Sequence, residues 1–509
     1  MSHPNAEASH PFLVIGSGPS GVIAALGLIR LGHRVLMLDC GKTPEKDAKK
    51  LGLQNRALPK SGLSFAVPRK TWFGSEFAYA PVGQQLGTGL VSSQARGGLS
   101  NVWGAASLPV TAKDLESWPI DLQDLSPHLA VASEELGVAG IRDDLESIFP
   151  FYAEPKTALD PSDQARLLEG HWKMRRDGLA KKGFRFGRSR LAVSAKNCGM
   201  DGHCLEGCEK DAIYHSTKTL EKLRANPSFQ YLSGWQVIRV DEGPGSDPDV
   251  QVVARSLLEG ERTFSAERVF LAAGPIETTR IVLQSRPDAS RTLSLKYHPY
   301  FLLPVLIHQA VQAKSLDRLH TLSQLFLELD RPEISDRPVH LQIYTYNSFL
   351  KDRLHRVPFL LKRAAVIQGY LHPHSCDPIQ ILAAPADSAG KVELQFLAPK
   401  RRNVVKKIRQ VSQEIFKNQF RLGMTPILPA LKAALPGADH HTGGQFPMAE
   451  KPQSNQTDRL GRISGWKKTH IVDSSVLPDL PTATLTLTVM ANSHRIATQA
   501  VAPNRLPHE

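Results

Sequence analysis

The sequence predicts a mixed α/β fold (α+β overall) with two domains, and three observations lead to that prediction. Residues 12–39 read as a strand, a glycine-rich turn, a helix and a second strand. A buried strand that ends in small residues follows at 269–274, as in the later strands of a parallel nucleotide-binding sheet. Between about 290 and 436 the pattern changes to short runs with strand character. These runs predict a second domain built on an antiparallel sheet.

The N-terminal unit has the pattern of a dinucleotide-binding βαβ motif. A strand over 12–15 runs into a G-x-G-x-x-G turn, and a helix follows over 22–31. The glycines of the turn are Gly16, Gly18 and Gly21. The first permits the tight turn, the second lets a pyrophosphate approach, and the third lets the helix pack on the strand. The next strand ends in Asp39, at the spacing where a carboxylate holds ribose hydroxyls.

The nucleotide-binding domain is expected to be discontinuous. A short strand at 471–473 and a helix from about 484 to 501 close the chain, after a Pro- and Gly-containing return near 437. The expected segments are 1–120, 186–290 and 437–509 for this domain, and 121–185 and 291–436 for the substrate domain.

The substrate domain is expected to contain strands and one basic helix. Strand-like runs occupy 301–307, 339–346 and 391–396. Within 399–421, apolar residues recur at i, i+4, i+7 and i+11, which indicates an amphipathic helix. These apolar residues are Val404, Ile408, Val411 and Ile415.

Composition limits the class of protein and its partners. The 509 residues are 41% hydrophobic and 22% charged, without an apolar run of the roughly 18 residues that span a membrane. The short polar N-terminus lacks a signal-peptide pattern, so we expect a cytoplasmic protein. The net charge of +13 suggests an anionic partner, but no nucleic-acid-binding motif is present. The basic stretches 350–372 and 399–421 are typical of a solvated face, or alternatively of a membrane contact or a lipid-linked substrate.

Six blocks in order resemble the glucose–methanol–choline family of FAD-dependent oxidoreductases. The blocks are 16–21, 96–104, 272–278, 296–299, 441–448 and 472–478. The resemblance implies a Rossmann-type FAD-binding domain with a discontinuous substrate domain. It also implies FAD as the cofactor. The residues it assigns to FAD are Gly16, Gly18, Ser20, Gly21, Asp39, Arg96, Gly98, Ser100, Asn101, Val237, Ala273, Gly274, Asp473 and Ser474.

The resemblance also assigns the catalytic positions. His441 matches the histidine expected to take the hydroxyl proton of an alcohol, unless it only bonds the backbone. If the match to the family motif were shifted by one residue, His440 would take this role instead. The family's second catalytic His or Asn falls on Thr484, which cannot act as a base at neutral pH but can hydrogen-bond an alkoxide or a water. The N-terminus of the helix that begins there would stabilise reduced flavin.

A cysteine cluster is the second distinctive feature. Cys198, Cys204 and Cys208 keep the spacing of a bacterial ferredoxin run, with Asp201 in place of the second cysteine. Three thiolates suit a 3Fe–4S cluster, and the segment resembles the sugar and polyol dehydrogenase branch of the family. In that branch such a cluster lies between FAD and an external acceptor. A loop without metal, or zinc bound with His203, are the alternatives.

The expected function is therefore FAD-dependent oxidation of a CH–OH group, most readily in a sugar or polyol. With a cluster, electrons would pass to a cytochrome or a quinone-linked protein. Two alternatives stay open: an oxidase that reduces oxygen without a cluster, and a non-catalytic flavin-binding subunit, since Thr484 breaks the expected pair.

Overall fold

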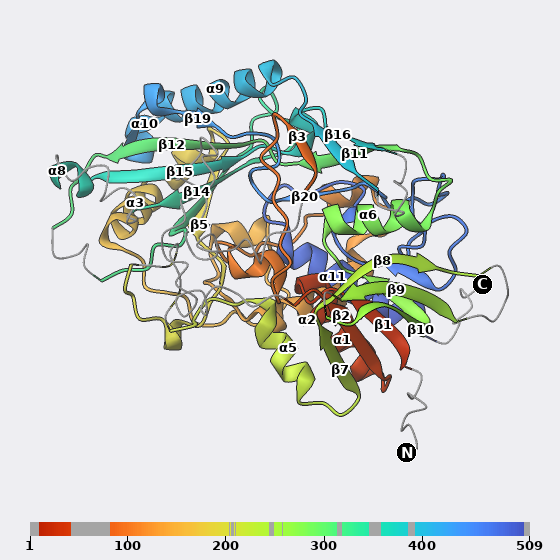
Figure 1. Cartoon of the computed structure of the whole chain (residues 1–509). Coiled ribbons are helices and arrows are strands. Elements are labelled where there is room, and N and C mark those ends of the chain that lie inside the picture. Colours follow the sequence, from red (N-terminus) through yellow and green to blue (C-terminus); the bar gives the residue numbers. More distant parts are fainter. Residues whose placement is uncertain are drawn as a thin grey trace, which may run out of the picture.

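We describe the protein from a computed structural model of the chain (Figure 1). The described residues are 10–41, 82–202, 204, 208, 210–243, 249–256, 258–312, 318–345, 358–384 and 392–502. His203, residues 346 and 391 of the predicted strands, and residues 350–357 of the first basic stretch lie outside them. Among the described residues, no helix has both the length and the apolar composition to cross a bilayer.

The first sheet is assembled from distant parts of the chain. Its strands are β1 (His10–Ile15), β2 (Val35–Asp39), β7 (Phe229–Ser233), β8 (Trp235–Asp241), β9 (Val250–Ser256), β10 (Gly260–Leu271) and β21 (Thr469–Ile471). Their order is β7-β2-β1-β10-β9-β8, and β21 also pairs with β10. The pairs around β1, β2 and β7 and the β10–β21 pair are parallel, whereas β8 and β9 form an antiparallel extension. The parallel sheet predicted from the first βαβ unit is therefore present.

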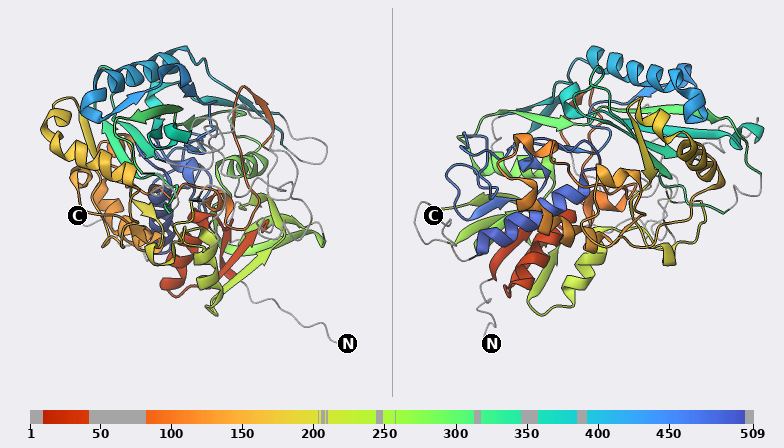
Figure 2. Two further views of the ribbon diagram at one scale, coloured as in Figure 1. Left: turned by 90° about the vertical axis from the view of Figure 1, so that its left-hand side faces the viewer. Right: turned by 180° about the vertical axis from the view of Figure 1, so that it is seen from behind.

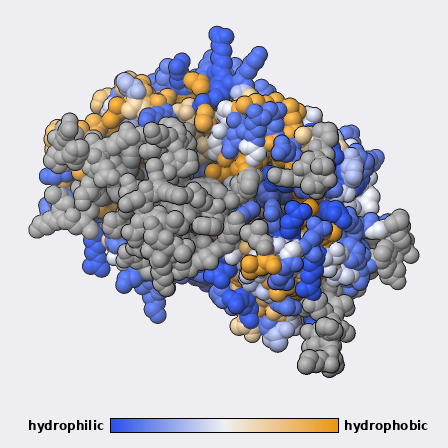
Figure 3. Space-filling model, viewed as in Figure 1, coloured by the Kyte–Doolittle hydropathy of each residue, from blue (hydrophilic) through white to orange (hydrophobic). Residues whose placement is uncertain are grey.

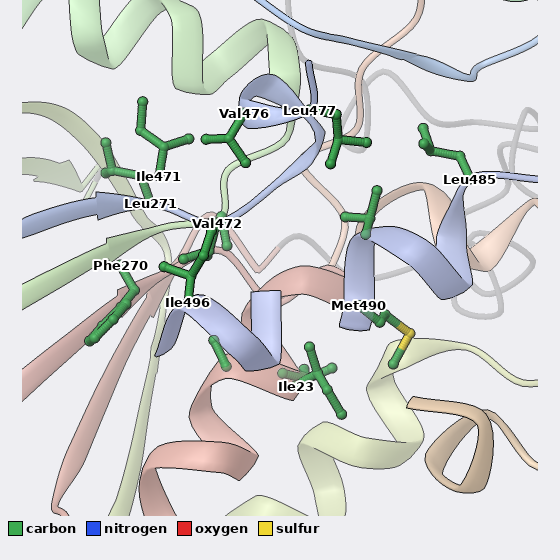
Figure 4. Packing of buried hydrophobic residues seen from close by; sticks show 14 of the residues in the cluster. Ile23, Phe270, Leu271, Ile471, Val472, Val476, Leu477, Leu485, Met490 and Ile496 are labelled. Atoms are coloured by element: carbon green, nitrogen blue, oxygen red, sulfur yellow. The ribbon is translucent and has the colours of Figure 1, made fainter. Parts of the chain in front are cut away.

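Helices cover this sheet and fix the N-terminal turn. They are α1 (Pro19–Arg30), α2 (Leu122–Leu136), α5 (Ser216–Arg224), α6 (Pro275–Ser285) and α11 (Thr486–Val501). Figure 4 shows Ile23 of α1 near Met490 and Ile496 of α11. Phe270 of β10 and Val472, which follows β21, lie on the sheet beside them. The hydroxyl of Ser493 donates to the carbonyl oxygen of Ser20 at 2.7 Å. The C-terminal helix thus holds the glycine-rich turn in place.

Two element boundaries differ from expectation. The strand predicted to reach residue 274 ends at Leu271. Gly274 has a φ of +83°, which turns the chain into α6 and cannot continue a strand. The last helix begins at Thr486, two residues later than expected, because residues up to 484 form an irregular loop.

The second sheet is antiparallel, as predicted, and α9 covers one face. Its strands are β5 (Phe184–Arg188), β12 (Tyr300–Ile307), β13 (Leu325–Leu329), β14 (Val339–Tyr344), β15 (Ala364–Tyr370), β18 (Met424–Pro426) and β19 (Lys432–Ala433). Alternate side chains of β12, from Phe301 to Ile307, pack with α3 (Asp163–Met174) and α9 (Arg402–Lys417). The buried stripe of α9 is the predicted one, from Val404 to Ile415. Figure 2 shows α9 on the outer side of this sheet, away from the first sheet.

A third sheet positions the site. It contains β3 (Gln84–Leu86), β11 (Thr292–Tyr297), β16 (Ile379–Ala383), β17 (Leu394–Leu397) and β20 (Thr442–Gly443), in the order β20-β11-β16-β17-β3. In the β11–β20 pair, Lys296 lies opposite Gly443 and Tyr297 opposite Thr442. This register brings residue 298 beside residue 441. Short elements complete the chain: β4 (Val138–Ala139), α4 (Arg176–Ala180), β6 (Leu191–Ala192), α8 (Pro358–Leu361) and α10 (Gln419–Leu422).

Candidate active site

A large cavity opens at the ends of the parallel strands, where α/β sheets usually bind their ligands. Its open space, which includes solvent at its mouth, is about 1260 Å³. The predicted residues that line it are Gly16, Gly18, Ser20, Asp39, Gly98, Val237, Ala273, Gly274, Asp473, Ser474 and His440. The predicted residues Gly21, Arg96, Ser100, Asn101, His441 and Thr484 are not among its lining residues.

The glycines of the first turn meet the requirements of a dinucleotide. Gly16 has a φ of +100°, and a Cβ there would lie 2.5 Å from the carbonyl oxygen of Ala272. A Cβ on Gly21 would lie 1.9 Å from the carbonyl oxygen of Gly16. A Cβ on Gly18 would meet no protein atom within 4 Å, so it would occupy cavity space alone. Gly18 also caps α1 without a side chain, which leaves the helix N-terminus open to a phosphate.

Asp39 lies at the wall of this cavity, at the end of β2. Its Oδ2 accepts hydrogen bonds from the Tyr231 hydroxyl, at 3.0 Å, and from the Ser17 hydroxyl. Burial raises the pKa of Asp39 to about 6, against the opposing effect of these two hydroxyls. The carboxylate is thus oriented by protein donors at the position predicted to hold ribose.

The loop at 96–101 forms a second wall, and its polar residues mainly hold its own shape. The Asn101 amide donates to the carbonyl oxygens of Arg96 and Gly98, at 2.9 and 2.8 Å. The Ser100 hydroxyl donates to Gly97 at 2.6 Å. Gly97 and Gly98 have φ values of +89° and +56°, and a Cβ on Gly98 would lie 3.8 Å from the Cα of Gly18. The loop therefore packs against the glycine-rich turn, and Gly98 itself reaches the cavity.

Asp473 joins the last strand to the start of α6. Its Oδ2 accepts the amide of Gly274 at 3.0 Å and the hydroxyl of Thr278 at 2.5 Å. Burial raises the pKa of Asp473. The hydroxyl of Ser474 donates to the carbonyl oxygen of Thr442 at 2.7 Å. Both residues line the cavity, and their hydrogen bonds join the segment at 473–474 to the start of α6 and to β20.

Two histidines and an aspartate meet beside the cavity, where β11 and β20 pair. Nδ1 of His441 lies 3.2 Å from Nδ1 of His298. Nε2 of His298 lies 2.8 Å from the carbonyl oxygen of Pro481. Asp439 accepts the backbone N–H groups of both histidines at 3.2 Å. Burial raises the pKa of Asp439 to about 8, so this carboxyl group is mostly protonated at neutral pH.

These contacts determine the tautomer of His441. A carbonyl oxygen only accepts, so His298 must donate from Nε2 to Pro481. Burial lowers the pKa of His298 well below its usual value, which keeps the ring neutral and its Nδ1 an acceptor. His441 then donates from Nδ1. Burial also lowers the pKa of His441, to about 3, so its Nε2 carries a lone pair and no proton. That is the form a general base needs.

His440 and Thr484 lie in different surroundings from His441. His440 has a φ of +63° and lines the cavity, and burial lowers its pKa to about 4. The Thr484 hydroxyl accepts the backbone N–H of Leu108 at 2.9 Å, and Thr484 is not among the residues that line the cavity. Leu485, Thr486 and Val489 line the cavity instead. They were not singled out in the sequence, because nothing in the loop before α11 indicates which side chain turns inward.

The cysteines lie on a separate loop, and each sulfur faces a backbone N–H. Cys208 Sγ accepts from Ala212 at 3.1 Å, and Cys204 Sγ from Thr321 at 3.4 Å. Burial is the largest cause that raises the pKa of Cys198 and of Cys204. Two groups of His and Asp side chains in the described part of the chain are close enough to share a metal ion, and neither contains a cysteine.

Comparisons with known proteins agree with this architecture. The family model described as GMC oxidoreductase, for the C-terminal part, matches residues 385–493. Pyridoxine 4-oxidase from Mesorbium loti is similar in structure, with a TM-score of 0.62 and 13% identity over 96% of this chain and 98% of that one. A formate oxidase is similar at a TM-score of 0.67 and 14% identity, over 98% and 99% of the two chains. No curated protein matches by sequence.

A variant of the Aspergillus oryzae RIB40 formate oxidase, with an arginine substitution that bears on FAD modification, is similar to the same degree. Its TM-score is 0.67 at 13% identity, over 98% of this chain and 99% of that one. At these identities the likeness concerns the fold alone.

Proposed function

Since this chain belongs to the glucose–methanol–choline family of FAD-dependent oxidoreductases, we propose that it oxidises a CH–OH group with His441 as the base. The observation that carries this proposal is the hydrogen-bonded chain from Pro481 through His298 to His441, beside the cavity that the glycine turn and Asp39 line. FAD supplies the hydride acceptor when bound. The glycine turn, Asp39 and the 96–101 loop fit its dinucleotide part.

The protein's own groups perform the proton transfer in this proposal. Nε2 of His441 accepts the hydroxyl proton of the substrate. His298 holds the imidazole in the correct tautomer, and Asp439 fixes the two backbone segments. The side chain of His441 is 21% exposed, while those of His298 and Asp439 are fully buried. His441 is therefore the member of this cluster that a substrate can reach.

This arrangement predicts an unusual pH dependence. The active form of His441 is neutral, and burial lowers its pKa to about 3, so acid down to pH 5 should not protonate it. The rate constant of flavin reduction by substrate should stay level between pH 7 and pH 5. A base with the ordinary pKa near 6.5 would instead lose about 25-fold over this interval. Anaerobic stopped-flow measurements across the interval distinguish the two, and a 25-fold loss would contradict the assignment.

A polar sheet face beside His441 supports a sugar or polyol as the substrate class. The ring of Tyr370 stacks on His441, with centroids 5.4 Å apart. On neighbouring β14, the Tyr344 hydroxyl donates to Gln342. The hydroxyl of Tyr300 and Oε2 of Glu328 are buried without a hydrogen-bond partner in the described part of the chain. Buried polar groups require partners, and a substrate with several hydroxyls would supply them.

A panel of alcohols, polyols and sugars tests the proposed function. Turnover is measured with oxygen and with a one-electron dye as alternative acceptors. We expect turnover with at least one hydroxyl compound. Faster turnover with the dye supports a dehydrogenase with a cytochrome or quinone-linked partner, and faster turnover with oxygen supports the oxidase. No turnover with any compound, in protein with full FAD content, would favour the non-catalytic subunit.

A 3Fe–4S cluster on Cys198, Cys204 and Cys208 is a second candidate feature. It is supported by the amides that face the sulfurs, because N–H groups commonly hydrogen-bond cluster ligands. Iron analysis should give about three atoms per flavin. The oxidised, anaerobically prepared protein should show a low-temperature EPR signal.

Cysteine variants separate this cluster from a structural loop. Cys204→Ser should remove the EPR signal and stop transfer to the one-electron dye while flavin reduction by substrate continues. Cys376→Ser is the matched control, since Cys376 forms no disulfide and lies outside both the cluster and the lining of the cavity. Iron-free protein with full dye activity would rule out the cluster and leave the loop structural.

A further inference from the structure

One end of the second domain exposes a group of large apolar side chains. Eight large hydrophobic residues are exposed in the described part of the chain, and four belong to α3, α8, the end of α9, and α10. These four, the apolar end patch, are Met174 (77% exposed), Phe359 (66%), Phe416 (42%) and Phe420 (75%). Figure 3 shows hydrophobic surface along the upper left edge, where Figure 1 places α10 and the adjoining end of α9. A cluster of this kind marks an interaction site more often than scattered single residues do.

Side-chain contacts connect the elements that carry the patch. The ring of His308 lies 5.7 Å from the ring of Phe420. The carbonyl oxygen of His308 accepts a hydrogen bond from Arg363 at 2.8 Å, and Arg363 follows α8 directly. On the other side, Nε2 of His171 lies 3.0 Å from the carbonyl oxygen of Phe420. These contacts connect the ends of α3 and α8 to α10, so the elements that carry the patch adjoin one another.

Basic side chains surround this patch. Between residues 402 and 422 there are six basic residues and one acidic residue, Glu414. Glu414 is 9% exposed and lies within ion-pair distance of Arg331 and Lys417. Exposed basic residues also flank Met174 and Phe359. The exposed basic residues next to the patch are Lys173, Arg175, Arg176, Arg363, Lys417 and Arg421.

We infer that this end of the protein docks on a membrane surface that carries anionic lipids. Exposed phenylalanine and methionine side chains would enter the interfacial region, and the surrounding cations would bind lipid headgroups. The positive charge around the patch favours an anionic membrane over a second copy of the chain, because two positively charged surfaces would repel each other. The inference does not depend on the reaction that the protein catalyses.

Vesicle sedimentation of the full chain with FAD bound tests the inference. Phosphatidylcholine vesicles with 30% phosphatidylglycerol should sediment the protein at low salt, and pure phosphatidylcholine vesicles should sediment much less. The double variant Phe359→Ser/Phe420→Ser should bind the anionic vesicles at least about tenfold more weakly. Arg421→Gln should weaken binding by about fivefold and reduce its salt dependence.

Leu258→Ser is the matched control, because Leu258 is 95% exposed in the turn between β9 and β10, away from the patch. It should bind as the unaltered protein does, and FAD content should be equal in all variants. Absence of binding to anionic vesicles would overturn the inference, as would equal binding by the double variant. Self-association that the double variant abolishes, measured by light scattering without vesicle binding, would assign the patch to a second copy instead.

Discussion

Replacement of His441 by alanine should leave FAD bound but slow its reduction by substrate at least ~100-fold. The variant removes the only group of the His298–Asp439–His441 cluster that is both neutral and accessible, so this cluster no longer supplies a base for the hydroxyl proton. The measurement is anaerobic stopped-flow absorbance at the flavin band, with FAD content determined on the same preparation. A reduction rate within threefold of the unaltered protein would contradict the role of His441.

Two further variants separate register and tautomer. His440→Ala should reduce flavin at nearly the normal rate, and a large loss there would move the base to His440, which lines the cavity. His298→Asn keeps a side-chain acceptor near Nδ1 of His441 and should retain more activity than His298→Ala. The ¹⁵N chemical shifts of His441, assigned by difference from His441→Ala, should report a proton on Nδ1. A proton on Nε2 would contradict the tautomer whether or not the protein is active.

Substitution of Gly18 by valine should give a folded but colourless protein. A Cβ at this position meets no protein atom within 4 Å, and the φ of Gly18, −64°, is ordinary for any residue. The substitution should therefore cost little folding stability and act through the space where a pyrophosphate would lie. FAD content after purification and the thermal midpoint without added FAD are the measurements.

Gly170→Val is the matched control for Gly18→Val. Gly170 lies on α3, and a Cβ there also meets no protein atom within 4 Å. This variant should keep a full complement of FAD. Full FAD content in Gly18→Val would show that the cofactor does not bind against the first turn.

Local patterns in the sequence were sufficient for the elements built from neighbouring residues. The glycine spacing predicts the β1–α1 turn, because only glycine permits the φ of Gly16 and the contact between Gly21 and Gly16. The apolar period predicts the stripe of α9 that packs on the second sheet. Each pattern lies within a stretch of about 20 residues, and the structure contains both elements.

Long-range pairing accounts for what the sequence did not reveal. His298 reaches His441 through the β11–β20 register, which joins residues 143 positions apart. Likewise, the Thr484 hydroxyl bonds Leu108, a residue 376 positions away. No local pattern encodes which loop a side chain meets after folding. The assignments of Thr484 to catalysis, and of Ser100 and Asn101 to FAD, stay predictions. In the structure these side chains form hydrogen bonds with the backbone.

The visible spectrum of the purified protein, recorded anaerobically before and after addition of a hydroxyl compound that supports turnover, tests the central claim most directly. We expect the bands of oxidised flavin at the start and their bleaching on addition of substrate, with His441→Ala showing the same bands without rapid bleaching. A protein that folds but carries no flavin, or whose flavin no hydroxyl compound bleaches, would contradict FAD-dependent oxidation of a CH–OH group.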